Sequence, residues 1–174
     1  MNTVLRLQQR LVPLAGTLLL IAIAFFDPSW SLHLVVLGVL ALITGFLRAY
    51  QLPLTKYTAL NLLGMVAVGG SLLAGASTAA FALAGGTFLS DWLALRKSIG
   101  ISWINAGREA VALVAAYGVY AAIAVWSGAT LRSGSLSETL PAIAAFFLAH
   151  FVFSRGLLYF SLIVRAKLCP KSGR

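Results

Sequence analysis

Apolar residues along this chain gather into six long runs that are separated by short polar gaps. The runs extend approximately over residues 11–26, 32–47, 57–74, 78–95, 109–126 and 140–164. A helix that crosses the roughly 30 Å hydrocarbon core of a bilayer needs about 17 to 25 apolar residues, and all six runs are near this length. A spanning segment must also satisfy its backbone hydrogen bonds internally, which favours helices. The pattern therefore predicts an all-α, polytopic integral membrane protein with six transmembrane helices.

The positions of the basic residues predict how these helices are oriented. Lys and Arg in short loops are retained on the cytoplasmic side of a membrane. If the N-terminus is cytoplasmic, eleven basic residues fall in cytoplasmic segments: Arg6, Arg10, Arg48, Lys56, Arg96, Lys97, Arg108, Arg165, Lys167, Lys171 and Arg174. The external segments contain Arg132 alone, and Arg155 lies inside the sixth run. We therefore predict that both termini are cytoplasmic.

The composition supports a membrane location and a single domain. Of the 174 residues, 60% are hydrophobic and 10% are charged, whereas about a quarter of residues are charged in a typical soluble domain. No polar linker divides the chain, so we predict one membrane domain over residues 1–168 and a short basic cytoplasmic tail over residues 169–174. The net charge of +9 would suggest nucleic acid in a soluble protein, but here it reflects membrane orientation. The lipid bilayer is therefore the predicted partner, and nucleic acid is not.

Small residues recur where the predicted helices would touch. The candidates for helix packing are Gly69, Gly70, Ala82, Gly85, Gly86 and Ser90. Ala82, Gly86 and Ser90 are spaced by four residues, a pattern that lets two helix backbones approach closely in a membrane. An alternative is that the segment over residues 85–87 bends or unwinds the fourth helix beside a ligand, as discontinuous helices do in transporters.

Four polar residues are predicted at membrane depth, where an ionisable group costs about 2.5 to 3.5 kcal/mol and needs a partner. They are Asp91, Arg155, His150 and Asn61. Asp91 lies near the end of its helix, where the helix dipole disfavours a carboxylate. We predict an ion pair between Asp91 and Arg155. Two alternatives remain open: Asp91 pairs with Arg96 or Lys97, or it caps a short helix at the membrane interface.

His150 is flanked by phenylalanines in the sixth run, an environment that could suit a tetrapyrrole or an aromatic ligand. The alternative is a hydrogen bond to a neighbouring helix. His150 and Arg155 are five residues apart, or about 140° around a helix, so we expect them to face different neighbours.

Asn105 and Glu109 are expected to begin the fifth helix, where a polar cap and an acidic residue in the first turn are favourable. The sequence shows no P-loop, dinucleotide-binding motif or paired catalytic carboxylates. Because it contains four acidic residues in all, we predict a non-enzymatic protein without a metal site.

Three segments in the second half carry a family resemblance. They are GGTFLSDWLALRK over residues 85–97, WINAGREA over residues 103–110 and FVFSRGLLYF over residues 151–160. Together they resemble the multi-helix N-terminal membrane domains that precede HD-GYP phosphodiesterase, diguanylate cyclase or histidine kinase output domains in bacteria. The resemblance implies a sensor domain in the bacterial cytoplasmic (inner) membrane, as a homodimer or with a partner protein. The sequence contains no output domain, so we expect a truncated sensor, a stand-alone homologue or a subunit that relays a signal to another protein.

Two other functions remain open. The Gly-Gly hairpin that ends in Asp91 is also similar to the substrate-binding subunits of energy-coupling factor transporters, which bind vitamins. The third reading is a structural subunit of a larger membrane complex. For all three, Asp91, Arg155, His150, Asn61 and Asn105 are the candidate ligand or ion-pair residues.

Overall fold

The computed structural model describes residues 3–50, 52–53, 59–60, 62–127 and 136–168 of the chain. This part contains six α-helices: α1 (Thr3–Phe26), α2 (Leu34–Ala49), α3 (Leu63–Ala74), α4 (Ala76–Leu89), α5 (Ile99–Ser127) and α6 (Leu136–Leu168). A 3₁₀ turn, η1 (Pro28–His33), precedes α2, and a π-helical turn, η2 (Ser90–Ala94), follows α4. The strands β1 (Leu52–Pro53) and β2 (Ala59–Leu60) form a minimal antiparallel hairpin. The predicted all-α fold with six helices is confirmed.

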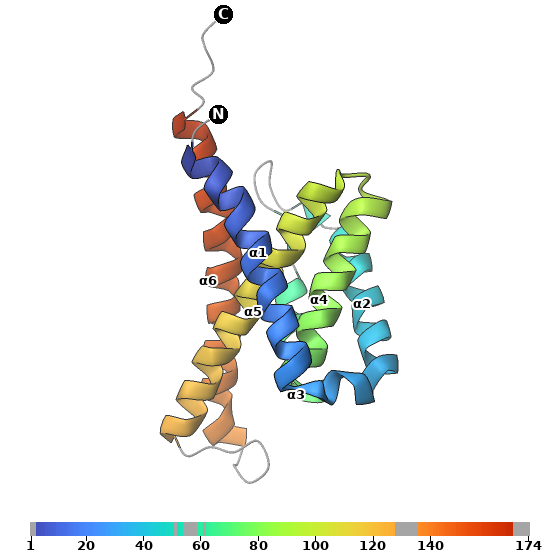
Figure 1. Cartoon of the computed structure of the whole chain (residues 1–174). Helices are drawn as coiled ribbons and strands as arrows, with labels where there is room; N and C mark the ends of the chain where they lie inside the picture. Colours follow the sequence, from blue (N-terminus) through green and yellow to red (C-terminus); the bar gives the residue numbers. More distant parts are fainter. Residues whose placement is uncertain (1–2, 51, 54–58, 61, 128–135, 169–174) are drawn as a thin grey trace, which may run out of the picture.

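The six helices alternate in direction along the bundle (Figure 1). The start of α1, the end of α6 and the turn that joins η2 to α5 lie at one end. The 3₁₀ turn η1 and the α3–α4 junction lie at the other end. Helix α4 has the central position, because it contacts α1, α2, α3 and α5. This arrangement brings the basic η2–α5 turn to the same end as the start of α1 and the end of α6.

Several helix boundaries differ from the predicted ones: α1 begins at Thr3 rather than near residue 11, α4 ends at Leu89 rather than near residue 95, and the starts of the third and fifth helices also move. The third helix begins at Leu63 rather than near residue 57, because the β1–β2 hairpin occupies part of the preceding apolar run. The fifth helix begins at Ile99, ten residues before Glu109. The segment over residues 99–108 contains polar residues that turn towards protein neighbours, so polarity there does not mark the end of the membrane domain.

Three of these helical segments are long and apolar enough to cross a membrane: Pro28–Ala49, Ile99–Trp126 and Thr139–Leu158. The apolar segments Arg10–Phe26 and Leu63–Ala74 are shorter. At 1.5 Å per residue, the 12 residues of α3 cover about 18 Å, less than a hydrocarbon core. The structure therefore supports a membrane protein, with three candidate spans among the described helices.

The outer surface of the bundle is apolar over wide areas. Phe26, Leu32, Val35 and Trp126 each expose more than 80% of their surface. Helix α2 is peripheral and presents a row of branched apolar side chains to the outside. An exposed apolar surface of this extent is unfavourable in water and suits contact with lipid tails. The fold thus supports contact with the lipid bilayer.

Small side chains fill much of the space between the helices. Ala80, Ala82, Ala110 and Ala116 are fully buried, and among the described residues the largest fully buried side chain is that of Phe146. Its ring packs against Tyr117 and Tyr120 of α5. Because apolar side chains gain little by leaving lipid, close backbone packing of this kind is the main source of helix association in a membrane.

The candidate packing glycines differ in what surrounds them. An added Cβ at Gly86 would collide with the carbonyl oxygen of Ala41 and lie 2.7 Å from Cβ of Thr44, so α2 and α4 require a glycine there. Ala82 is buried in the same helix, and the Ser90 hydroxyl donates to the carbonyl of Gly45 at 2.9 Å. At Gly70 an added Cβ would lie 3.1 Å from Leu40 and 3.3 Å from Ala79.

Two predicted packing positions are corrected. An added Cβ at Gly69 or Gly85 would meet no atom within 4 Å, because both residues face open space rather than a neighbouring helix. A close approach that the sequence analysis did not single out joins α1 to α5. There, an added Cβ at Gly107 would lie 2.7 Å from Cα of Pro13, and one at Gly16 would collide with Gly107.

Helix α4 is continuous through residues 85–87, so the alternative that this segment unwinds is wrong. The departure from α-helical geometry comes later, in the π-helical turn η2, which contains Asp91. Turns of this type insert an extra residue and frequently occur at functional sites.

At the opposite end, Asp27 organises the junction between α1 and η1. Its carboxylate accepts hydrogen bonds from the backbone N–H and hydroxyl of Ser29, and the Ser29 hydroxyl lies 3.1 Å from that of Ser77 in α4. The side-chain hydrogen bond from Ser29 holds the pKa of Asp27 below its ordinary value of 3.8. This contact therefore contributes to stability above that ordinary value and is lost as the pH falls through the lowered one.

Adjacent glycines give a matched test of the α2–α4 contact. We expect Gly86→Ala to destabilise the protein by about 1 to 3 kcal/mol, because the methyl group has no room. Gly85→Ala should be neutral or stabilise by up to about 1 kcal/mol through helix propensity alone. Unfolding of both variants in detergent, followed by loss of helical signal, measures the difference. Equal stability of the two would contradict the close approach.

Candidate functional site

The π-helical turn and the residue after it determine where Asp91 points. Within η2 the Leu95 N–H donates to the carbonyl of Ser90 at 2.9 Å. Arg96 then adopts a left-handed backbone with φ of 50°, and the Lys97 N–H donates to the carbonyl of Asp91 at 2.8 Å. The chain thus reverses tightly before α5 begins, and the Asp91 side chain is turned inward with none of its surface exposed.

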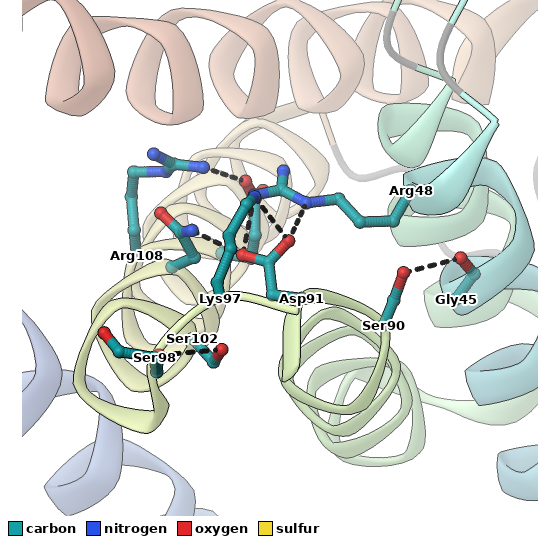
Figure 2. Close-up of polar contacts among 10 residues, drawn as sticks. Gly45, Arg48, Ser90, Asp91, Lys97, Ser98, Ser102 and Arg108 are labelled. Carbon is teal, nitrogen blue, oxygen red and sulfur yellow. Dashed lines mark hydrogen bonds and ion pairs between the residues drawn. The ribbon is translucent and has the colours of Figure 1, made fainter. Parts of the chain in front are cut away.

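The Asp91 carboxylate is the centre of a polar network (Figure 2). Arg48, in the last turn of α2, donates from Nε to Oδ1 at 3.1 Å and from a terminal nitrogen to Oδ2 at 3.2 Å. Lys97 donates from Nζ to Oδ1 at 2.8 Å. The Asn105 amide of α5 donates to Oδ2. One carboxylate therefore joins α2, η2, the following turn and α5.

These contacts correct the predicted ion pair between Asp91 and Arg155. The described cations that form salt bridges with Asp91 are Arg48 and Lys97. Lys97 was one of the alternatives, whereas Arg48 was assigned to a cytoplasmic loop because it ends the second apolar run. In the structure only 8% of Arg48 is exposed, since it turns back across α4 instead of towards the outside.

A second buried carboxylate lies in α5, the helix that follows η2 in the chain. Glu109 is fully buried in the third turn of α5, not in the first turn as predicted. Its Oε1 accepts from Arg108 at 3.0 Å, and its Oε2 accepts from the Ser154 hydroxyl of α6 at 3.1 Å. Glu109 therefore ties α5 to α6 as Asp91 ties α2 and η2 to α5. The sequence analysis placed Glu109 in a first helical turn and Arg108 in a cytoplasmic segment, and it did not single out Ser154.

A cavity of about 230 Å³ lies between the two carboxylate clusters. It is lined by Arg48, Leu95, Lys97, Asn105, Arg108, Ser154, Arg155 and Leu158. Two of the predicted site residues, Asn105 and Arg155, are therefore brought to the same cavity beside the Asp91 network. Most of the lining is cationic or a hydrogen-bond donor, which favours an anionic occupant.

His150 lies outside this cavity but close to it. It is 3% exposed and lines a separate space of about 20 Å³ together with Gly64, Phe147, Phe151, Ser154 and Arg155. His150 and Arg155 line the same space, so the prediction that they face different neighbours is wrong. The space is the size of one water molecule, so a tetrapyrrole does not fit against His150.

The remaining predicted site residue is Asn61. It lies outside the described residues. Within the described part, no group of three or more His, Cys, Asp and Glu side chains is placed to hold a metal ion. The candidate site is consequently the Asp91 network with its adjoining cavity.

Comparison of the chain with protein-family models, curated proteins and solved structures finds no match. The function must therefore be argued from the network itself.

A double-mutant cycle tests the partner of Asp91. We expect Arg48→Gln and Asp91→Asn each to destabilise the protein by about 3 to 5 kcal/mol, because each leaves buried charge without its partner. Their combination should cost less than the sum by about 1 to 3 kcal/mol. A parallel cycle with Arg155→Gln should show smaller coupling to Asp91→Asn. Unfolding free energies in detergent measure both cycles, and stronger coupling to Arg155 would contradict the assignment.

Proposed function

We propose that all six helices cross or enter the cytoplasmic membrane of a bacterium and that both termini face the cytoplasm. The alternating helix directions support this, as does the position of the η2–α5 turn at the end where α1 starts and α6 finishes (Figure 1). Arg48, Arg96, Lys97 and Arg108 belong to segments at this basic end. The excess of basic residues in these segments supports a cytoplasmic location under the positive-inside rule.

On this framework we propose a non-enzymatic function as a sensor or accessory module that relays a signal to a partner protein at the cytoplasmic face. The observation that carries the proposal is the attachment of three parts of the chain to one buried carboxylate. Through Arg48, Lys97 and Asn105, Asp91 links α2, the η2–α5 turn and α5. Any shift of α2 or α4 must therefore move the basic turn or break a salt bridge.

The network has the properties of a two-state element. Lys97 is 34% exposed on its side chain, whereas Asp91 is fully buried and Arg48 nearly so. The more accessible bond to Lys97 can open while the inner bonds to Arg48 persist. Small helix movements at such contacts are a known means of switching, because packed interfaces change between discrete arrangements. The exposed residues of the turn, including Arg96 and Ser98, would carry the change to a partner.

A carrier of small molecules is a weaker second proposal. A cavity of about 180 Å³ at the opposite end is lined by residues that include Asp27, Ser77 and Tyr117. Pockets that enclose a vitamin-sized ligand usually measure about 300 to 1,000 Å³. The polar network at the other end also has no part in such a site, so the relay function accounts for more of the structure.

Labelling of single cysteines tests the proposed orientation. In a Cys169→Ser background, Ser98→Cys should react with a membrane-impermeant maleimide in inverted vesicles and not in intact spheroplasts. Ser31→Cys, in the exposed part of η1, should show the opposite pattern. The physical reason is that the two positions lie at opposite ends of the bundle. Labelling of both positions from the same side would contradict the proposed topology.

Site-specific photo-crosslinking in the native cell tests the relay. A photoreactive residue at position 98 should form an adduct with a discrete partner protein, whereas the same residue at position 31 should not. Asp91→Asn should reduce the adduct at position 98 several-fold, because the turn loses its attachment. Gly85→Ala serves as a control that leaves the network intact. Adducts unchanged by Asp91→Asn, or no adduct specific to position 98, would sink the proposal.

A further inference from the structure

The cavity between Asp91 and Glu109 carries an excess of positive charge. Four of the residues that line it are cationic: Arg48, Lys97, Arg108 and Arg155. The two carboxylates beside it are already engaged, Asp91 by Arg48 and Lys97 and Glu109 by Arg108. Four cations therefore surround the space against two anions.

Among the described residues, no other acidic side chain supplies the negative charge that this cavity lacks. The whole sequence contains four acidic residues, and of the other two, Asp27 lies at the opposite end of the bundle in contact with Ser29 and Ser77. Glu138 lies near the start of α6, about four helical turns before Ser154. Among the described residues, the groups at the cavity therefore carry more positive than negative charge. Cations gathered around one cavity repel one another, so an anion among them would be stabilising.

Arg108, which also lines the cavity, has a hydrogen-bond donor without a partner among the described residues. It is 8% exposed and directs one terminal nitrogen to Glu109, while its buried Nε has no hydrogen-bond partner among the described residues. A buried donor without a partner costs about 1 to 3 kcal/mol, so it is normally matched by an acceptor. Asn105 and the Ser154 hydroxyl add polar atoms to the same wall, and Leu95 and Leu158 close the cavity with apolar surface.

We propose that this cavity binds a phosphate group. Arginine side chains match phosphate oxygens with paired, charge-assisted hydrogen bonds, and three arginines converge here. A phosphate monoester carries about 1.5 to 2 negative charges near neutral pH, which balances the excess of two positive charges, whereas the phosphodiester of a lipid head group carries a single negative charge and offsets part of it. The group is supplied either by the head group of an anionic phospholipid or by a soluble phosphate compound. This assignment does not rest on the relay function or on a protein partner.

The first experiment uses the purified full chain in a neutral detergent. Its melting temperature is measured against inorganic phosphate, with potassium chloride adjusted to keep the ionic strength constant. A parallel series adds phosphatidylglycerol to the micelles, with zwitterionic phosphatidylcholine as the control. Saturable stabilisation by inorganic phosphate supports a soluble ligand, because ligand binding to the folded state raises stability by mass action. Stabilisation by phosphatidylglycerol alone supports a lipid head group.

Two basic positions, one in the cavity wall and one outside it, provide the variants. Arg155→Gln removes a cation from the cavity wall and should weaken the apparent affinity for the effective probe about tenfold. Arg96→Gln removes the same charge from the exposed turn beside Lys97, outside the cavity, and should leave the affinity unchanged. No stabilisation by either probe, or equal losses in the two variants, would overturn the proposal.

A further pair of variants keeps the test decisive if Arg155→Gln does not fold. Arg155→Lys retains the charge but loses the planar pair of donors, so its affinity should lie between those of the wild type and Arg155→Gln. Arg108→Gln combined with Glu109→Gln removes a cation without leaving Glu109 unpaired, and it should also weaken binding about tenfold. Unchanged affinity in both would show that the arginines do not hold the probe.

Discussion

The fully buried carboxylate of Asp91 and its bonds to Arg48, Lys97 and Asn105 are the constraint on which one end of the bundle depends. An isolated carboxylate would be very costly in this position, and its neighbouring cations would be costly without it. The network therefore has to form as a unit. Because its members come from α2, η2, the following turn and α5, their positions are set together once the helices pack.

The packing around the network makes this geometry attainable. Gly86 lets α2 approach α4 closely enough for the Ser90 hydroxyl to reach the carbonyl of Gly45 one turn before Arg48. The π-helical turn then directs Asp91 inward. Arg96, with its left-handed backbone, reverses the chain so that Lys97 can bond to the Asp91 carboxylate. A close helix contact and an irregular turn thus cooperate to bury one charge cluster. The second cluster, on Glu109, joins α5 to α6 beside it.

The length of the apolar runs was enough to predict the six helices, because each apolar run has to be placed against lipid or a neighbouring helix. The predicted importance of Asp91 came from the cost of polar groups at membrane depth, whereas Asn105 was expected to cap the fifth helix; the structure brings both residues into the network. Arg155 was placed at the wrong contact, yet it lines the adjoining cavity.

Other parts of the site could not be read from the sequence. Arg48 resembles any basic residue that ends an apolar run, and its inward direction depends on the α2–α4 contact rather than on its neighbours in the chain. Glu109 was expected near a helix start, but α5 begins ten residues earlier, so its burial follows from tertiary packing. The helix start at Ile99 and the π-helical turn carry no strong propensity signal. These features depend on contacts between distant segments.

Hydrogen–deuterium exchange of the backbone amides measures the central claim most directly, because it reports local opening at each end of the bundle separately. If Asp91 holds the η2–α5 turn in place, Asp91→Asn should speed exchange over residues 95–105 about tenfold or more and leave residues 28–34 unchanged. Asp27→Asn, the matched change at the other end, should show the reverse. Exchange over residues 95–105 that is the same in Asp91→Asn and in the wild type would contradict the account.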